Sequence, residues 1–248
     1  MGINLFPDKK HCPFDCPYCE VFPFTANMVF SCEQMEEDLR AAVTAALEQN
    51  VTVQDICFSG NGEPSLSSDF PAALKRADSI RREMIPAAEL VLITNGAGLL
   101  QPEIFSLLQD AAALNIWLKL DAGTPQWYTK INRTAISFEK LIAKIKEFAA
   151  SVPVTIQTML CAVDNEGPPD DEAQAWEALV LELAAIAVAT GGIRTVQIYG
   201  KARPAPEDPK TTALPITYLE ERAESLHRAL AAANARIKIS VPPVKVYP

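Results

Sequence analysis

The chain has 248 residues, of which 49% are hydrophobic and 21% are charged, and its formal net charge is −9. This size and composition are those of a folded globular protein and exclude a disordered or low-complexity chain. The negative charge disfavours a protein that mainly coats nucleic acid, because contacts with phosphates require lysine and arginine.

Six apolar runs of strand length follow one another along the chain, and helical patterns separate them. The apolar runs occupy residues 2–6, 53–59, 89–94, 115–120, 154–160 and 195–199. The helical patterns occupy residues 31–49, 70–84, 102–114, 138–151, 172–190 and 216–234. Strands this apolar are covered on both faces, so the alternation predicts an α/β fold with a parallel sheet, either doubly wound or closed as a barrel.

The chain is expected to form one domain, 1–248, with a core over 1–205 and a C-terminal helix and strand over 206–248. The proline-rich stretch 202–215 is interpreted as a loop, and 236–241 as an extra edge strand. The start of the chain lacks the pattern of a signal peptide, and the apolar stretch 178–190 is too short to span a bilayer. We therefore expect a cytoplasmic protein with no membrane partner.

Five loops rich in glycine, asparagine and charged residues follow predicted strands. They occupy residues 11–20, 59–66, 94–98, 121–133 and 200–204. In parallel α/β folds the active site lies at the carboxyl ends of the strands, so these loops are expected to meet at one edge.

The first of these loops contains three closely spaced cysteines, Cys12, Cys16 and Cys19. Such a cluster in a large chain without a signal peptide indicates metal binding or redox chemistry. Zinc with His11 as fourth ligand is one alternative, although adjacent residues rarely bind one tetrahedral metal. Cys32 is another possible fourth ligand, but it begins a predicted helix, where a small buried hydrophobe is expected. Three thiolates with an open position are typical of a catalytic centre.

The C-x-x-x-C-x-x-C spacing, with Tyr18 before the last cysteine, resembles the signature loop of radical S-adenosylmethionine (SAM) enzymes. The segments "FSGNGEPSL", "LITNGAGLL", "WLKLDAGT", "KINR" and "YGKARP" are similar, in order, to segments of the small wyosine-synthase-like group of iron–sulfur oxidoreductases. The resemblance covers residues 1–205. It implies a partial (β/α)6 barrel, open on one side, with an extra C-terminal edge strand.

The resemblance also implies the cofactors and the chemistry. Cys12, Cys16 and Cys19 would hold a [4Fe–4S] cluster, and SAM would bind its fourth iron. Reduction of SAM would release a 5′-deoxyadenosyl radical that abstracts hydrogen from the substrate. An electron donor such as flavodoxin or ferredoxin is an implied partner.

Residues in three of the resembled segments are implied to bind SAM. Gly60, Gly62 and Glu63 would face its amino group, and Lys119 its carboxylate. Tyr18 would place its backbone near the adenine. The sequence departs from the family pattern in two places: the glycine loop carries the extra Asn61, and strand 154–160 lacks glycines.

Four further residues are implied to contact SAM or substrate. Asn95 or Asp121 would bond the ribose hydroxyls, and Arg133 and Arg203 would bind SAM or substrate. Each of the first two has a simpler interpretation, since Asn95-Gly96 is also typical of a turn and Asp121 of a helix cap.

The predicted edge also carries positive charge in an otherwise acidic chain. Its basic residues are Lys9, Lys10, Lys130, Arg133, Lys201 and Arg203. This pattern favours a small anionic substrate, with solvated loop charges as the alternative. Cys161, at the end of a predicted strand, either returns a hydrogen atom to a product radical or is a buried hydrophobe.

Four functions are compatible with these features. The first is a radical SAM enzyme, of oxidoreductase or lyase type, acting on a small anion. A tRNA-modifying radical SAM enzyme is favoured by the resembled group and disfavoured by the charge. The third is an activase that installs a glycyl radical on a partner protein, and the last is a non-enzymatic zinc module.

Overall fold

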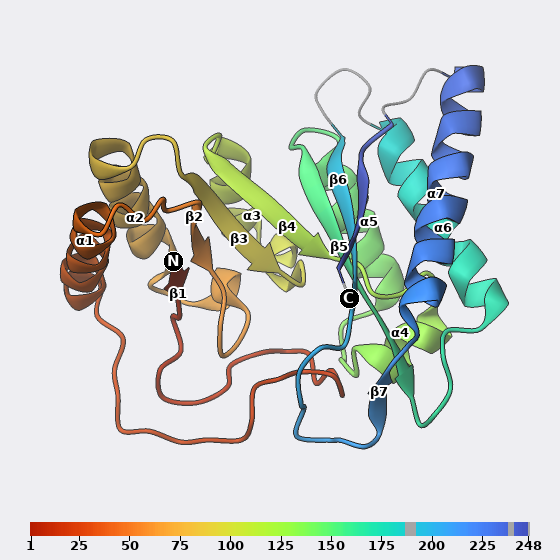
Figure 1. The fold of residues 1–248 in the computed structure, drawn as a ribbon, viewed down its shortest axis with the longest axis horizontal. Coiled ribbons are helices and arrows are strands. Elements are labelled where there is room, and N and C mark those ends of the chain that lie inside the picture. The colour runs from red at the N-terminus through yellow and green to blue at the C-terminus, as the bar shows by residue number, and fades with distance from the viewer. Residues whose placement is uncertain (187–191, 238–240, 248) are drawn as a thin grey trace. The chain divides into compact units, whose positions relative to one another are not determined.

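The structure is a computed structural model that describes residues 1–186, 192–237 and 241–247. Its contacts divide the chain into two compact units (Figure 1). The first unit comprises Met1–Cys12 and Pro23–Ile116, and the second comprises Pro13–Phe22 and Trp117–Pro248.

The first unit contains three parallel strands in the order β1 (Gly2–Ile3), β2 (Asp55–Phe58) and β3 (Glu89–Thr94). Its helices are α1 (Cys32–Glu48), α2 (Phe70–Met84) and α3 (Pro102–Asp110), with short 3-10 helices at Pro64–Leu66 and Ala97–Leu100. Phe58 of β2 packs edge-on against Phe70 of α2, with ring centroids 5.4 Å apart. Both rings are fully buried, so this contact fixes α2 on the strands and supports the turns that follow them.

The second unit contains β5 (Val154–Val163), β6 (Ile193–Gly200) and β8 (Val244–Tyr247) as parallel neighbours, with β7 (Thr211–Ala213) antiparallel to β5. Strand β4 (Leu114–Lys119) leads into this unit. Its helices are α4 (Pro125–Ile131), α5 (Phe138–Ala149), α6 (Asp170–Ile186) and α7 (Ile216–Ile237). Helix α7 packs against α6, β6 and β8 (Figure 1).

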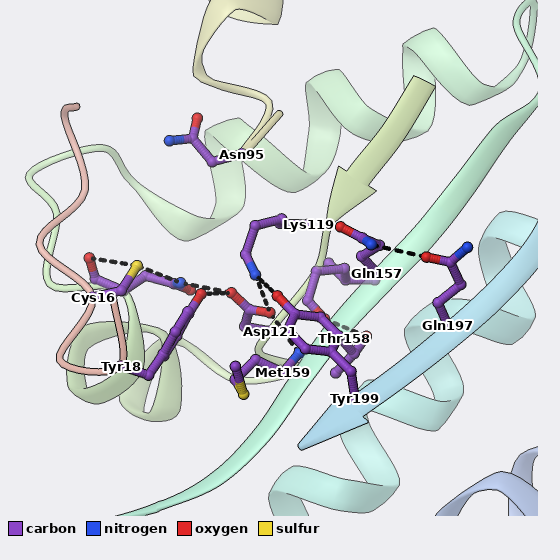
Figure 2. A network of polar contacts seen from close by, with 12 residues as sticks. Cys16, Tyr18, Asn95, Lys119, Asp121, Gln157, Thr158, Met159, Gln197 and Tyr199 are labelled. Atoms are coloured by element: carbon purple, nitrogen blue, oxygen red, sulfur yellow. Dashed lines mark hydrogen bonds and ion pairs between the residues drawn. The ribbon is translucent and has the colours of Figure 1, made fainter. Parts of the chain in front are cut away.

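Alternation along β5 and β6 gives this sheet one apolar and one polar face. Ile156 and Ile198 are fully buried. The alternate residues Gln157 and Gln197 pair across the strands, with Gln157 Nε2 2.8 Å from Gln197 Oε1 (Figure 2). Because successive side chains of a strand point to opposite faces, these two glutamines lie on the face opposite Ile156 and Ile198.

The six predicted strands are all present, and the parallel α/β prediction is confirmed. Two local predictions are wrong. Part of the predicted loop 202–215 forms β7, which pairs with the end of β5. The extra strand is β8, not 236–241, because the alanine-rich α7 continues through Arg236 and Ile237. Residues 187–190 of the predicted helix 172–190 and 238–240 of the predicted edge strand lie outside the described residues.

Within the described ranges, no helix is both long and apolar enough to cross a membrane.

Candidate functional site

In the first unit, the turn after β2 is hydrogen-bonded to the start of the cysteine loop. The amide of His11 donates to the carbonyl of Asn61 over 2.9 Å, and the amide of Glu63 donates to the carbonyl of His11 over 2.8 Å. A Cβ atom on Gly62 would lie 2.0 Å from that His11 carbonyl oxygen. Gly62 is therefore required for this close backbone approach, while Gly60 has a φ of +119° that favours glycine.

The carboxylate of Glu63 joins this turn to the end of β3. The side chain is only 2% exposed. One oxygen, Oε1, accepts hydrogen bonds from the amide and hydroxyl of Ser65 and from the hydroxyl of Thr94. The other, Oε2, accepts from the amide of Asn95 over 2.7 Å. Burial raises the pKa of Glu63 despite these donors. In this arrangement both oxygens have partners within the protein, so binding of the SAM amino group by Glu63 stays a prediction.

Asn95 forms the turn that was one of its two interpretations, and its bond to the ribose hydroxyls of SAM stays a prediction. Its Oδ1 accepts a hydrogen bond from the amide of Ala97 over 2.9 Å, and Gly96 has a φ of +80°, so the segment is a turn. Its Nδ2 lies 3.4 Å from Cys12 Sγ. The turn therefore directs a side-chain amide at one of the three predicted ligands.

In the second unit, the cysteine loop is anchored on α4. The ring of Phe14 packs edge-on against Tyr128, with centroids 5.8 Å apart, and the amide of Asp15 donates to the carbonyl of Asn132 over 3.0 Å. Asn132 Nδ2 lies 3.5 Å from Cys16 Sγ. Thr124 caps α4 by accepting the amide of Trp127, so the alternative interpretation of Asp121 as the helix cap is wrong.

Asp121 is instead the centre of a buried polar network that includes Tyr18, Lys119 and Met159 (Figure 2). It is 4% exposed. The hydroxyl of Tyr18 donates to its Oδ2, and the backbone amide of Met159 donates to Oδ1 over 2.9 Å. Asn132 Nδ2 also donates to Oδ2, over 3.1 Å. The network connects the cysteine loop, the end of β4 and the middle of β5.

Lys119 carries the positive charge that balances Asp121. Its Nζ lies 3.4 Å from Asp121 Oδ1 and donates to the hydroxyl of Tyr199. It also lies over the rings of Tyr18 and Tyr199, 4.9 and 4.8 Å from their centroids. Burial is the largest single influence and opposes the charge, but Asp121, Tyr199 and Cys16 together outweigh it and raise the pKa of Lys119. Lys119 is therefore protonated and partnered here, and its predicted contact with the SAM carboxylate stays a prediction.

Cys161, near the end of β5, is 1% exposed. Burial, and then the charge of Asp121, raise the pKa of its thiol to about 12. Cys161 is thus a neutral thiol at neutral pH. This fits the buried-hydrophobe interpretation, and the hydrogen-return role stays a prediction.

Most of the predicted basic residues are paired with carboxylates. The pairs within the second unit are Lys130 with Glu166 (2.8 Å), Arg133 with Glu207 (2.6 Å), Lys201 with Asp208 (2.9 Å) and Arg203 with Glu20 (2.7 Å). The partner side chains lower the pKa of Glu166, Glu207 and Asp208, so these carboxylates are charged at neutral pH. An anion would have to compete with them for the cations.

The structure places three residues here that were not predicted from the sequence. Asn132 and Tyr199 join the polar network around Asp121, and the ring of Tyr128 packs against Phe14. Tyr199 and Asn132 lie within the quoted segments "YGKARP" and "KINR", so the resemblance marked their location without marking their roles. Tyr128 gave no signal, because an aromatic residue in a short helix is expected in any core.

The chemistry of the cysteine loop fits a sulfur-ligated cluster. Cys12, Cys16 and Cys19 are partly buried and form no disulfide, and side-chain amides lie near the first two. Tyr128 offers a buried hydroxyl that lacks a partner in the described part of the chain, and burial and the adjacent Cys16 raise its pKa.

Among residues 1–186, 192–237 and 241–247, no group of three or more His, Cys, Asp or Glu side chains is arranged to hold a metal ion. Cys32, the alternative fourth ligand, faces the carbonyl of Asp69 at 4.0 Å.

The model of the radical SAM superfamily matches residues 9–175 of the chain. A UPF0026 protein of Helicobacter pylori strain J99 is 24% identical over an alignment of 156 residues, which covers 57% of this chain and 48% of that protein. The chain thus spans about half the length of this curated relative.

Solved structures resemble the whole chain. SuiB of Streptococcus suis, bound to S-adenosylmethionine, superposes with a TM-score of 0.69 at 12% identity over 100% of this chain and 50% of SuiB. TYW1 with a lysine–pyruvate adduct gives a TM-score of 0.61 at 14% identity over 92% of this chain and 73% of TYW1. At these identities the likeness concerns the fold.

Proposed function

Because the chain belongs to the radical SAM superfamily, whose model covers residues 9–175, we propose that it is an enzyme of oxidoreductase or lyase type that acts on a small anionic substrate. Membership of this family implies SAM and an iron–sulfur cluster. In the proposal, Cys12, Cys16 and Cys19 hold a [4Fe–4S] cluster. When bound, the cluster supplies the electron that cleaves SAM and so makes hydrogen abstraction from the substrate possible.

The observation that carries the proposal is the pair of amide contacts on the cysteine loop. Asn95 Nδ2 lies 3.4 Å from Cys12 Sγ, and Asn132 Nδ2 lies 3.5 Å from Cys16 Sγ. A buried thiol needs no such donors, whereas a thiolate that binds iron carries negative charge and accepts them.

The chain's own residues would perform three tasks around the cofactors. The turns at Gly62 and Asn95 and helix α4 hold the two ends of the cysteine loop. Lys119 and Asp121 form a charge pair that would exchange its present partners for the carboxylate and hydroxyl groups of SAM. Tyr18 fixes the end of the loop through its bond to Asp121.

Arg133 and Arg203 are the proposed contacts for an anionic substrate. Arg203 is 76% exposed in its side chain and paired with Glu20, while Arg133 is paired with the half-buried Glu207. Ion pairs near a surface contribute little free energy, so a substrate anion can replace the glutamate carboxylate. A flavodoxin or ferredoxin is the proposed source of electrons.

The test is anaerobic reconstitution with iron and sulfide, followed by electron paramagnetic resonance of the reduced protein with and without SAM. We expect a [4Fe–4S]⁺ signal that changes when SAM is added. The Cys16→Ala variant should lack this signal. The Cys57→Ala variant, which removes a cysteine of β2 outside the loop, should retain it. Zinc in the purified protein, or a cluster signal indifferent to SAM, would refute the proposal. If the protein binds unfractionated tRNA and this binding weakens steeply as the salt concentration rises, the tRNA-modifying alternative is favoured.

A further inference from the structure

Asn132 is held at the end of α4 by two backbone hydrogen bonds. Its amide donates to the carbonyl of Tyr128 over 2.9 Å, and its carbonyl accepts the amide of Asp15 over 3.0 Å. The residue is 3% exposed. The cysteine loop therefore helps to fix the backbone of Asn132, and burial limits the positions that its side chain can take.

The orientation of the Asn132 amide follows from its neighbours. The atom that faces Asp121 Oδ2 at 3.1 Å must be the NH2 group, because an ionised carboxylate only accepts hydrogen bonds. The same nitrogen lies 3.5 Å from Cys16 Sγ. An amide nitrogen carries two hydrogens, so one can point at the carboxylate while the other points at the sulfur.

Asp121 cannot easily turn away from this arrangement. Its Oδ1 accepts the amide of Met159 over 2.9 Å and lies 3.4 Å from Lys119 Nζ. Its Oδ2 also accepts the hydroxyl of Tyr18. A carboxylate held from the sheet and from the cysteine loop in turn holds the amide of Asn132 in one orientation.

We propose that Asn132 is a positioning residue that donates an N–H to the sulfur of Cys16 in the cluster-loaded protein and thereby raises the reduction potential of the cluster. This inference rests on the proposed function, since it assumes that Cys16 binds iron. Reduction adds negative charge that is shared by the sulfur ligands, and a hydrogen bond to a ligand sulfur stabilises the reduced state more than the oxidised state.

The test is the one-electron reduction potential of the reconstituted cluster, measured by a redox titration that is monitored by electron paramagnetic resonance. Asn132→Leu keeps a similar volume and removes the donor. We expect the ratio of reduced to oxidised cluster at a fixed potential to fall about tenfold, which corresponds to about 59 mV for one electron. Iron and sulfide content should match those of the wild type.

The matched control is Asn115→Leu. The side chain of Asn115 also donates from Nδ2 to a carboxylate, that of Glu89, over 2.9 Å, and not to a cysteine. Its substitution should leave the potential unchanged. If Asn132→Leu fails to load a cluster, Asn132→Ser keeps one donor and should give a smaller negative shift.

The outcomes separate this inference from the proposed function. If the wild type forms no cluster that responds to SAM, the proposed function fails. Suppose instead that the wild type forms a cluster that responds to SAM, and that each Asn132 variant that binds a cluster has the wild-type reduction potential. The proposed function then stands, and the role of Asn132 is overturned.

Discussion

The hydroxyl of Tyr128 is buried, and the ring that carries it packs against other aromatic rings. The residue is 6% exposed, and its ring packs against Phe14 and Phe138. Within the described residues its oxygen has no hydrogen-bond partner. Since a buried polar group without a partner costs about 1–3 kcal/mol, Tyr128→Phe should raise the unfolding free energy of the metal-free protein by about 1 kcal/mol. Urea denaturation measures this change.

Tyr218→Phe is the matched control for that prediction. The hydroxyl of Tyr218 donates to the carbonyl of Pro168 over 3.3 Å, so its removal should lower the unfolding free energy by about 0.5–1.5 kcal/mol. Destabilisation by both variants would show that the Tyr128 hydroxyl has a partner in the metal-free protein.

Cys161 should show the effect of burial on thiol chemistry. Its pKa is raised to about 12, chiefly by burial. A thiol whose pKa is raised on folding contributes stability that is present below the ordinary thiol pKa and is lost as the pH rises towards 12. At pH 8, iodoacetamide should therefore not modify Cys161 in the native protein, but it should modify the partly exposed Cys19.

Mass spectrometry of peptides from the metal-free protein checks this difference. In urea, both cysteines should react at similar rates, because unfolding removes the burial. Equal reactivity of Cys161 and Cys19 in the native protein at pH 8 would contradict the prediction.

At the scale of elements, the turn after β2 depends on the absence of a side chain at Gly62. A Cβ there would lie 2.0 Å from the carbonyl oxygen of His11, which is backbone and cannot move without breaking its bond to Glu63. Gly62→Ala should therefore lower the unfolding free energy by about 1–3 kcal/mol, the usual cost of overpacking. It should also reduce iron incorporation, because the start of the cysteine loop is displaced.

Gly2→Ala is the control, because a Cβ on Gly2 would meet no atom within 4 Å. Its unfolding free energy should stay within about 0.5 kcal/mol of the wild type. Denaturation by urea and iron content per chain report on both variants. Equal stability of the two variants would show that the contact between the turn and His11 is not formed in solution.

The elements that the sequence predicted well are those with a strong local pattern. Strands β2 to β6 are apolar runs, and α1 begins where Ser31 accepts the amide of Gln34. Strand β7 has three residues, and its pairing with Cys161–Val163 depends on a partner about fifty residues away in sequence. No local pattern encodes such pairing, so the sequence indicated a loop there.

The same distinction applies to the site. Cys12, Cys16 and Cys19 were recognisable because their spacing is local. The contact of Asn132 with Cys16 joins residues 116 positions apart, and the pairing of Arg203 with Glu20 also depends on tertiary structure. Sequence alone therefore indicated an excess of basic residues at the predicted edge, where the structure shows cations that are largely matched by carboxylates.

At the scale of the whole molecule, the proposed dependence of SAM binding on the cluster has a thermodynamic consequence. A ligand that binds only the native state, at a free concentration 100 times its Kd, stabilises that state by about 2.7 kcal/mol. For a chain of this size, each 1 kcal/mol shifts the Tm by about 2–4 °C, so saturating SAM should raise the Tm of the cluster-loaded protein by about 5–10 °C. Anaerobic calorimetry of the reconstituted protein measures this shift.

The metal-free protein supplies the control for that measurement. Without iron at an open position, SAM would retain only its contacts with the chain, and the carboxylates that pair with Lys119, Arg133 and Arg203 oppose an anionic group there. We therefore expect SAM to shift the Tm of the metal-free protein, and of Cys16→Ala treated with iron and sulfide, by less than about a quarter of the shift in the loaded wild type. An equal shift in all three preparations would show that the chain binds SAM independently of iron, and the open position would then have no part in binding it.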